Sequence, residues 1–235
     1  MIASVPVIAD ADISAPAALI GDPTRATFIM ALSEGRSLPA SELARRAGVT
    51  ASTASIRLAK LVEGGLLATE RNGRHRYYSL VDPEVAAAIE ALAVIAPRRP
   101  ASSLKQARHG SELQAARTCY DHLAGALGVS LLEALRRERL LTAELEVTRH
   151  GEKRFRELGI DIGRLGGRRR PLTRSCLDWT ERRDHLAGSL GAALATRCFE
   201  LGWIERRPAG RAVRLTARGR RKLPDQFRVD LPRGV

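Results

Sequence analysis

The sequence predicts a mainly α-helical protein with small β-hairpins, of the α+β class. Apolar residues recur at helical spacing in four segments before residue 97. Between the third and fourth of these segments, the pair Asn72-Gly73 separates two short β-prone runs, which is typical of a hairpin. Further on, the phrase DHLAGALG at 121–128 returns as DHLAGSLG at 184–191, which indicates an internal duplication.

Three helices are expected before residue 64. Their ranges are 15–35, with a break at Asp22-Pro23, then 38–47, and then 51–63. Gly48 ends the second helix, and a side-chain cap at Thr50 or Ser52 starts the third. A tight link through glycine is what two steeply crossing helices require, so these two helices form a helix-turn-helix.

A hairpin and a fourth helix complete this part of the chain. Strands at 66–70 and 75–80 flank Asn72-Gly73, because Asn-Gly readily adopts the positive φ angles of a type I′ turn. This hairpin is the predicted wing. The fourth helix covers 84–96, and such a terminal helix often pairs two subunits, which predicts a homodimer. Its apolar positions are Val85, Ile89, Leu92 and Ile95.

Three parts of the chain are expected. Residues 1–96 form a winged helix-turn-helix domain for DNA binding and dimerisation, 97–110 form a linker rich in proline, serine and basic residues, and 111–235 form a duplicated C-terminal half. Each copy is expected to begin with a helix, continue with a short helix or strand and end with a helix that starts at threonine, as in a degenerate winged-helix unit. Only the second copy keeps a clear wing, 203–215, which turns at 208–210.

The charge and composition of the chain indicate which classes of partner to expect. A net charge of +13 favours a polyanion such as double-stranded DNA, and 44% hydrophobic residues suit a folded protein. No apolar run reaches the roughly 18 to 20 residues that cross a bilayer, and no secretion signal is evident, so no membrane partner is expected. Three cysteines at irregular spacing indicate a reducing compartment, the cytoplasm.

The third helix carries the predicted DNA chemistry. Its small polar face permits a close approach to base edges, while the preceding helix and the wing supply basic contacts to phosphates. Ile56 lies on the same face. The predicted DNA-binding residues are Arg45, Arg46, Thr50, Ser52, Thr53, Ser55, Arg57, Lys60, Arg71, Arg74, His75 and Arg76.

Five phrases stand out in about the first 95 residues. They are Asp22-Pro23-Thr24-Arg25, Ser41-Glu42-Leu43-Ala44, the Ser/Thr-rich third helix, Gly64-Gly65-Leu66 and the run 74–80. Together these phrases resemble the ArsR family of winged-helix regulators. The resemblance implies a homodimer that binds inverted repeats and usually represses until an inducer releases it. Some metal-sensing members place cysteines in the helix before the recognition helix, but 38–48 contains none here.

Three hypotheses remain open for the C-terminal half. In the first, Cys119, His122, Cys176 and His185 bind zinc or a similar ion, because two thiolates and two imidazoles form a soft tetrahedral set. Against it, no short spacing links the four residues, and Cys198 is expected to be packing. In the second, a small organic effector binds between the copies. Its expected aromatic walls are Tyr120, Trp179, Phe199 and Trp203.

In the third hypothesis, the basic run 206–222 of the second copy adds phosphate contacts. Two alternatives from other classes accompany these hypotheses. Catalysis is not expected, because Asp121-His122 and Asp184-His185 are neighbours that would point about 100° apart on a helix. A winged-helix adaptor that binds protein instead of DNA is the stronger rival, although the basic wing disfavours it.

Overall fold

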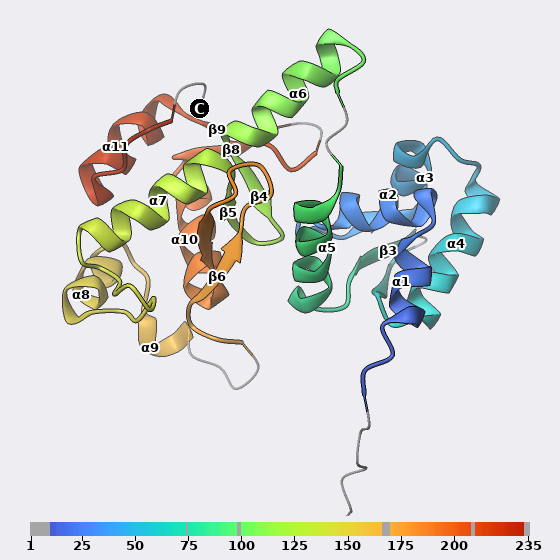
Figure 1. The fold of residues 1–235 in the computed structure, drawn as a ribbon, viewed down its shortest axis with the longest axis horizontal. Helices are drawn as coiled ribbons and strands as arrows, with labels where there is room; N and C mark the ends of the chain where they lie inside the picture. The colour runs from blue at the N-terminus through green and yellow to red at the C-terminus, as the bar shows by residue number, and fades with distance from the viewer. Residues whose placement is uncertain (1–9, 74, 98–99, 166–169, 208–209, 233–235) are drawn as a thin grey trace, which may run out of the picture. The chain divides into compact units, whose positions relative to one another are not determined.

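The computed structural model describes residues 10–73, 75–97, 100–165, 170–207 and 210–232, and it divides into two compact units (Figure 1). Unit 1 is Met1–Leu32 with Arg36–Val81, and unit 2 is Ser33–Gly35 with Asp82–Val235. This division differs from the expected boundary at residue 96. Helix α5, Pro83–Ile95, belongs to unit 2 because it packs beside strand β6, Arg174–Leu177.

Unit 1 is a helix-turn-helix followed by a hairpin. Its elements are α1 Ser14–Ile20, α2 Pro23–Leu32, β1 Leu38–Pro39, α3 Ala40–Ala47, α4 Ala51–Glu63, β2 Leu67–Asn72 and β3 His75–Leu80. The predicted break at Asp22-Pro23 and the three predicted helices are present. The core forms where α2, α3 and α4 meet the sheet, whereas α1 buries none of its residues. Fully buried members of the core include Phe28, Ile29, Leu43, Ala54, Leu58 and Leu61.

The helix-turn-helix has the expected local chemistry. Gly48 ends α3 at a φ of 64°, a left-handed conformation that glycine adopts without a Cβ clash. Thr50 caps α4, since its hydroxyl accepts a hydrogen bond of 3.2 Å from the backbone N–H of Thr53. These two features turn the chain sharply and orient α4 against α2 and α3.

The sheet of unit 1 differs from the prediction in two details. Strand β1 was not expected, and it pairs antiparallel with β3 through Leu38 and Tyr78, so that the strand order is β1-β3-β2. The turn of the wing also lies one residue later than predicted, because Asn72 still pairs with His75 inside the ladder. Gly73 has a φ of 59°. The predicted DNA contact Arg74 lies outside the described residues.

Unit 2 begins with α5 and α6, Leu104–Ala115. The sequence predicted a linker over 97–110, but α6 occupies its second half. Ser103 caps this helix, since its hydroxyl accepts a hydrogen bond of 3.2 Å from the N–H of Gln106. The remaining elements are β4 Arg117–Cys119, β5 His122–Ala124, α7 Gly125–Arg137, α8 Arg149–Glu157, α9 Ile162–Leu165, β6 Arg174–Leu177, β7 Asp184–Ala187, α10 Gly188–Glu200, β8 Ile204–Arg206, β9 Val213–Leu215 and α11 Ala217–Phe227.

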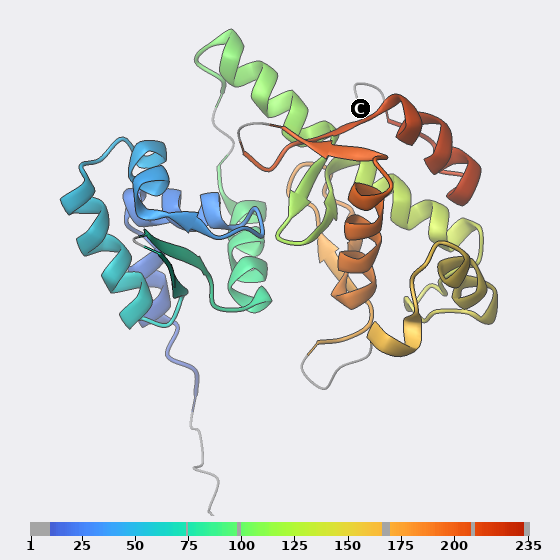
Figure 2. The same cartoon turned by 180° about the vertical axis from the view of Figure 1, so that it is seen from behind.

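The two copies of the repeated phrase occupy equivalent places. In each copy a hairpin leads into a long helix, and a helix capped by threonine follows, at Thr148 in the first copy and Thr216 in the second. The hairpin β8–β9, seen from behind in Figure 2, is the second wing predicted at 203–215, and its turn residues 208–209 lie outside the described part of the chain. In the first copy, an isolated bridge between Leu141 and Val147 replaces this wing.

The long helix of each copy packs against the hairpin of the other copy. Helix α7 packs against β7 of the second copy, and α10 packs against β5 of the first. Two glycines face these contacts, since a Cβ on Gly128 would stand 3.5 Å from Cβ of His185 and one on Gly191 3.3 Å from Cβ of His122. Within each copy the same glycines allow the tight turn from hairpin to helix, because the added Cβ would stand 2.4 Å from the carbonyl oxygen of Leu123 or Leu186, respectively. One continuous apolar core joins both copies and contains Leu127, Leu190 and Phe227, among others. Unit 2 beyond α6 is therefore a single folded body.

The expectation that Asp121 and His122 point apart on a helix was wrong. Asp121 lies in the β4–β5 turn, after Tyr120 with its φ of 59°, and His122 starts strand β5. The helix begins only at Gly125, whose φ is 73°. The phrase DHLAG is thus the end of a hairpin and the first residue of a helix, and the same holds for its second copy at 184–188.

Candidate DNA-reading helix and buried Cys/His cluster

Helix α4 separates a core face from an exposed face. Ala54, Leu58 and Leu61 are fully buried, whereas Ser52 and Ser55 are exposed. Ile56 lies on the exposed face with 62% of its surface accessible, and an exposed aliphatic group among small polar residues can contact the methyl group of thymine. The face is small enough to approach base edges closely.

Three predicted DNA contacts on α4 lie around one hollow of unit 1. The guanidinium of Arg57 forms an ion pair with the carboxylate of Asp22. Thr53 and Lys60 lie nearby, and with Arg25 and Ile56 they line a hollow of about 270 Å³. Arg57 is therefore held by unit 1 itself, and its guanidinium must leave Asp22 or share it with a phosphate to contact DNA.

The other predicted contacts lie on α3 and on the wing. Arg45 and Arg46 both bind the carboxylate of Glu42, at 2.7 and 2.9 Å. On the wing, Arg71 and Arg76 are exposed and stand directly opposite each other in the β2–β3 ladder, next to exposed His75. Like charges at opposed positions repel, so a bound polyanion relieves a cost that the free hairpin bears.

The four predicted metal ligands of the C-terminal half come together. Cys119 is the cross-strand partner of His122, and Cys176 is the cross-strand partner of His185. Directly opposed residues of an antiparallel pair share one face, and the two hairpins bring those faces together. The ligand atoms of the four side chains all lie within 4.8 Å of one another, and the two sulfur atoms are 4.0 Å apart.

Both imidazoles of this Cys/His cluster are buried beside carboxylates. The Nδ1 atom of His122 lies 3.3 Å from Asp121, which binds Arg170 through two contacts of 2.5 and 2.9 Å. The Nδ1 atom of His185 lies 3.5 Å from Asp178. Among the described residues, neither Nε2 atom has a hydrogen-bond partner, and neither has Nδ1 of His185, although His122 is 4% and His185 0% exposed.

These contacts determine in which direction the pKa values of the ionisable groups in the cluster are shifted. Burial opposes ionisation of Asp121, but Arg170 and His122 outweigh it and lower the pKa of that carboxyl to about 2. A hydrogen bond from the Cys119 thiol lowers the pKa of Cys176, and the two imidazoles lower it further. The same bond and burial raise the pKa of Cys119. By contrast, burial alone raises the pKa of Cys198 to about 12, which suits its packing role.

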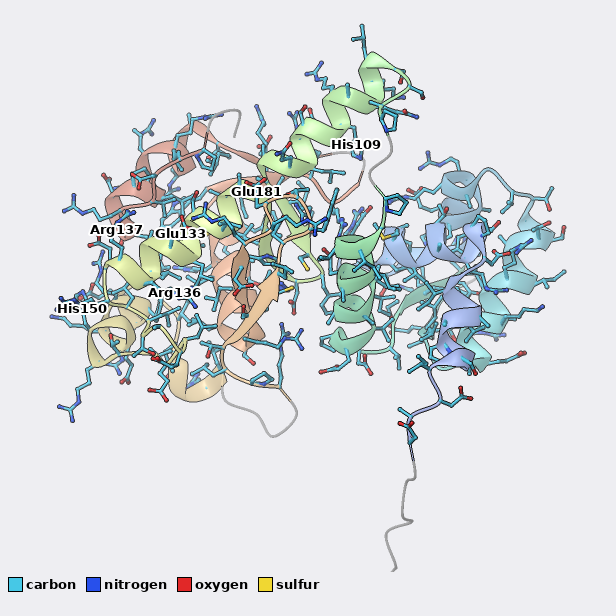
Figure 3. The ribbon with its side chains drawn as sticks, in the orientation of Figure 1. His109, Glu133, Arg136, Arg137, His150 and Glu181 are labelled. Atoms are coloured by element: carbon cyan, nitrogen blue, oxygen red, sulfur yellow. The ribbon has the colours of Figure 1, made fainter. Side chains whose placement is uncertain are left out.

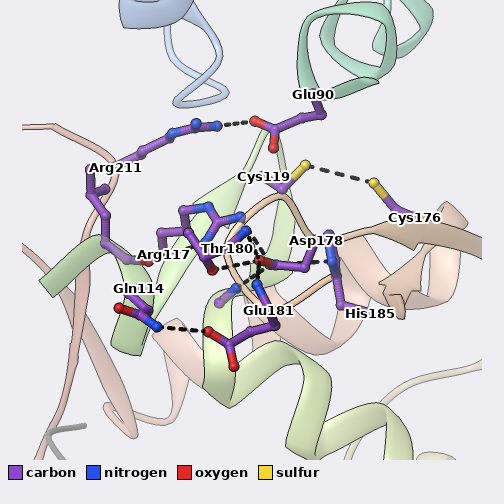
Figure 4. A network of polar contacts seen from close by, with 12 residues as sticks. Glu90, Gln114, Arg117, Cys119, Cys176, Asp178, Thr180, Glu181, His185 and Arg211 are labelled. Carbon is purple, nitrogen blue, oxygen red and sulfur yellow. Dashed lines mark hydrogen bonds and ion pairs between the residues drawn. The ribbon is translucent and has the colours of Figure 1, made fainter. Parts of the chain in front are cut away.

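The Cys/His cluster can be reached from the surface of unit 2. Cys176 is part-exposed and lines a cavity of about 360 Å³ between α5 and β6. Ala87, Ala91 and Val94 of α5 form one wall of this cavity, and Glu90 of the same helix lies beside them. Glu90 is buried and forms an ion pair with Arg211 (Figure 4). An ion or small molecule that reaches Cys176 thus also meets α5.

A buried polar network supports the second hairpin. Arg117 and Asp178 form an ion pair with both side chains at 0% exposure, and the N–H of Gly125 donates to Asp178 over 2.6 Å (Figure 4). Thr180 donates both its N–H and its hydroxyl to the same carboxylate. Asp178 thereby fixes the β6–β7 loop against the start of α7. Sequence reasoning missed Asp178, Arg117 and Glu90, since no local pattern links residues so far apart.

The aromatic residues of the effector hypothesis have separate packing partners. Trp203 is in the core, Phe199 lies under the guanidinium of Arg206, and Trp179 lies under that of Arg117, 4.9 Å from the ring centre. Tyr120 is half-buried in the β4–β5 turn. These contacts favour packing roles over a shared aromatic pocket.

The basic run 206–222 is also partly engaged within unit 2. Arg207 binds Glu112 at 3.0 Å, Arg211 binds Glu90, and Arg214 binds Glu205. Arg218 and Arg220 of α11 are exposed. Elsewhere in the unit, Glu133 of α7, labelled in Figure 3, is part-exposed. It forms an ion pair with Arg183 of the β6–β7 loop. The internal pairs of 206–214 weaken the hypothesis that this run clamps DNA.

A helix-turn-helix with an exposed second helix, followed by a basic hairpin, defines a winged-helix DNA-binding protein. Known proteins of this class are similar to the chain in sequence. A family described as "Helix-turn-helix domain" matches residues 20–70. The uncharacterized HTH-type transcriptional regulator YdfF of Bacillus subtilis is 44% identical over 205 residues, which cover 86% of this chain and 91% of YdfF. The chain belongs to this family of helix-turn-helix transcriptional regulators.

Solved structures are similar over about a third of the chain. The transcriptional repressor BigR from Xylella fastidiosa is 25% identical, with a TM-score of 0.35, and the match covers 37% of this chain and 88% of BigR. A homodimeric winged helix-turn-helix domain from Mycobacterium bovis, titled "a possible ArsR-family transcriptional regulator", is 23% identical with a TM-score of 0.33 and covers 35% and 76%. Within the described residues, no helix is long and apolar enough to span a membrane.

Proposed function

We propose that the protein is a homodimeric repressor that reads an operator through α4 and the β2–β3 wing, and that an effector bound in unit 2 releases it. One observation carries the DNA-reading step. The exposed face of α4 offers Ser52, Ser55 and Ile56 while its opposite face is fully buried. A helix so divided can enter the major groove without unfolding its own core.

The wing supports the same step. Arg71 and Arg76 are exposed and opposed on one hairpin, so they can bind phosphates on either side of a groove edge. The repulsion between them has no structural benefit in the free protein. A polyanionic partner supplies the compensating charge.

Helix α5 supports a homodimer. Leu92 and Ile95 are 42% and 78% exposed, and they lie one turn apart on the same helix. A second copy of α5 would cover these side chains. A dimer of winged-helix proteins reads two half-sites in successive turns of the groove, about 34 Å apart. This arrangement requires an inverted repeat in the operator.

Footprinting and run-off transcription test the proposal together. We expect the purified protein to protect two inverted half-sites in the DNA upstream of its own coding sequence and to reduce transcription from that DNA. A Leu92→Glu/Ile95→Glu variant should protect neither half-site at the same concentration. An increase in transcription would contradict repression, and protection of one half-site by a monomer would contradict the dimer.

The exposed Ile56 also favours a second candidate, a winged-helix adaptor whose α4 docks on a protein. Its small polar neighbours give no extended apolar patch, which disfavours that candidate. Absence of any DNA binding at low salt, where non-specific contacts to phosphate are strongest, would support the adaptor.

A further inference from the structure

We propose that Cys119, His122, Cys176 and His185 form a tetrahedral site for a zinc-like divalent cation that joins the two repeats of unit 2. The four side chains supply two sulfur and two nitrogen ligands, two from each hairpin. This donor set suits Zn²⁺ and its thiophilic relatives, whereas Mg²⁺ and Ca²⁺ prefer oxygen.

The geometry is close to that of a tetrahedral site. With zinc–sulfur bonds of about 2.3 Å, two thiolates on one ion stand about 3.8 Å apart. The sulfur atoms of Cys119 and Cys176 stand 4.0 Å apart, and all four ligand atoms lie within 4.8 Å of one another. Small side-chain rotations therefore suffice to close the ligands around an ion.

The imidazoles distinguish a metal site from a simple thiol pair. A disulfide between Cys119 and Cys176 would leave the Nε2 atoms of His122 and His185 buried and without partners in the described structure. Burying a polar atom without a hydrogen bond costs about 1–3 kcal/mol, so two such atoms at one point need an explanation. A cation between them supplies one partner to both.

The surrounding carboxylates have the arrangement that metal-binding histidines commonly use. Asp121 lies at hydrogen-bond distance, 3.3 Å, from Nδ1 of His122, which leaves Nε2 of His122 for the ion. Asp178 lies 3.5 Å from Nδ1 of His185 without a hydrogen bond, so both ring nitrogens of His185 are left for the ion. Arg170 and Arg117 in turn bind these carboxylates. The groove between α5 and β6 gives an ion access to Cys176.

Four protein ligands fill the tetrahedron, so the site has no open position for a reacting water and is not catalytic. The ion connects hairpins of both repeats and lies next to α5. A bound ion is then the effector that the proposed function requires, and this step alone depends on that function. Metal binding itself can be measured without DNA.

The test uses the full chain, purified with reduced thiols and freed of metal by a chelator. After addition of Co²⁺ and dialysis, we expect one ion per chain, sulfur-to-cobalt charge-transfer absorption, and the intense visible bands of a tetrahedral site. Zn²⁺ should displace the Co²⁺ and raise the Tm. Each of Cys119→Ser, Cys176→Ser and His122→Gln removes one ligand. Each should weaken Co²⁺ binding more than the loss of a residue that only orients a ligand, which costs about 10- to 100-fold.

Two further variants sharpen the result. Cys198→Ala, which changes a core cysteine outside the cluster, should bind Co²⁺ with the same spectrum as the parent protein. Asp121→Asn should keep the one-ion stoichiometry but bind about 10- to 100-fold more weakly, because it orients His122 without touching the ion. The Tm of each metal-free variant shows whether it is folded.

Two results would overturn the proposal. One is Co²⁺ binding that is equally tight in the folded Cys119→Ser and Cys176→Ser variants. The other is a reduced, folded parent protein that takes up no metal while mild oxidation joins Cys119 to Cys176, which would make the pair a redox switch.

Discussion

Arg117 and Asp178 form an ion pair that lies wholly inside unit 2 and joins its two repeats. The Nη2 atom of Arg117 is 2.9 Å from Asp178 Oδ2, and neither side chain is exposed. Removing two charges from water is costly, and the pair offsets this cost through further hydrogen bonds to Gly125 and Thr180. The pair thus fixes the hairpin that presents Cys176 and His185.

The first prediction concerns this pair. Asp178→Asn leaves the guanidinium of Arg117 buried without a counter-charge, and we expect it to destabilise the protein by about 3–5 kcal/mol in urea unfolding. The double variant Arg117→Met/Asp178→Leu removes both charges and should recover much of this loss. A single variant as stable as the parent would show that the pair is not held in the buried arrangement.

The second prediction concerns the start of α10. Gly188 has a φ of 84°, and an added Cβ would stand 2.7 Å from the carbonyl oxygen of Leu172. Gly188→Ala should therefore cost more than the roughly 1–2 kcal/mol of a left-handed conformation alone. Gly202 provides the control, since its φ is 64° and no atom lies within 4 Å of its added Cβ. Equal unfolding free energies for the two variants would contradict the close approach.

The third prediction concerns the wing. Arg71→Ala/Arg76→Ala should weaken DNA binding and make the slope of log K against log salt shallower by about 0.9 for each phosphate that the variant no longer neutralises. Because the two guanidinium groups repel each other in the free hairpin, the variant should not lose thermal stability. Arg218→Ala/Arg220→Ala on α11 is the matched control, and a greater weakening of DNA binding in that variant would move the phosphate-binding surface to the second repeat.

The fourth prediction concerns the dimer. Leu92→Glu/Ile95→Glu should convert the proposed dimer into a monomer in sedimentation analysis, because each added charge must be desolvated in an apolar contact. Leu104→Glu on α6 is the control, since Leu104 is 91% exposed and lies on another helix. A monomer–dimer equilibrium that α5 substitutions do not change would place the interface elsewhere.

Local patterns predicted the helix-turn-helix well. Pro23, Gly48 and Thr50 determine where α2, α3 and α4 begin or end, and each acts through its own backbone conformation or nearest neighbours. The short strand β1 was missed, because two residues carry no periodicity and only pairing with β3 makes Leu38–Pro39 a strand. The same limit applies to the wing turn, whose register depends on the partner strand.

The cluster of Cys119, His122, Cys176 and His185 was identified through the repeat rather than through spacing. Equivalent positions in two copies of one phrase come together when the copies pack symmetrically, as the packing of α7 on β7 and of α10 on β5 shows. The helical interpretation of DHLAG failed because the left-handed residues Tyr120 and Gly125 bend the chain into a hairpin. Asp178 was not singled out, although RSCLD at 174–178 resembles RTCYD at 117–121, because the longer β6–β7 loop offsets the phase of the second copy.

The most direct test of DNA reading by α4 is the affinity of Ser52→Glu for the upstream DNA, measured together with its Tm. A carboxylate in the first turn of α4 stabilises the helix through its dipole, so the Tm should stay equal or rise. The same charge repels DNA at the exposed face, and we expect affinity to fall more than about tenfold, or about 1.4 kcal/mol. Ser111→Glu on α6 adds the same charge away from α4 and should change neither value. Unchanged affinity in Ser52→Glu would contradict the account.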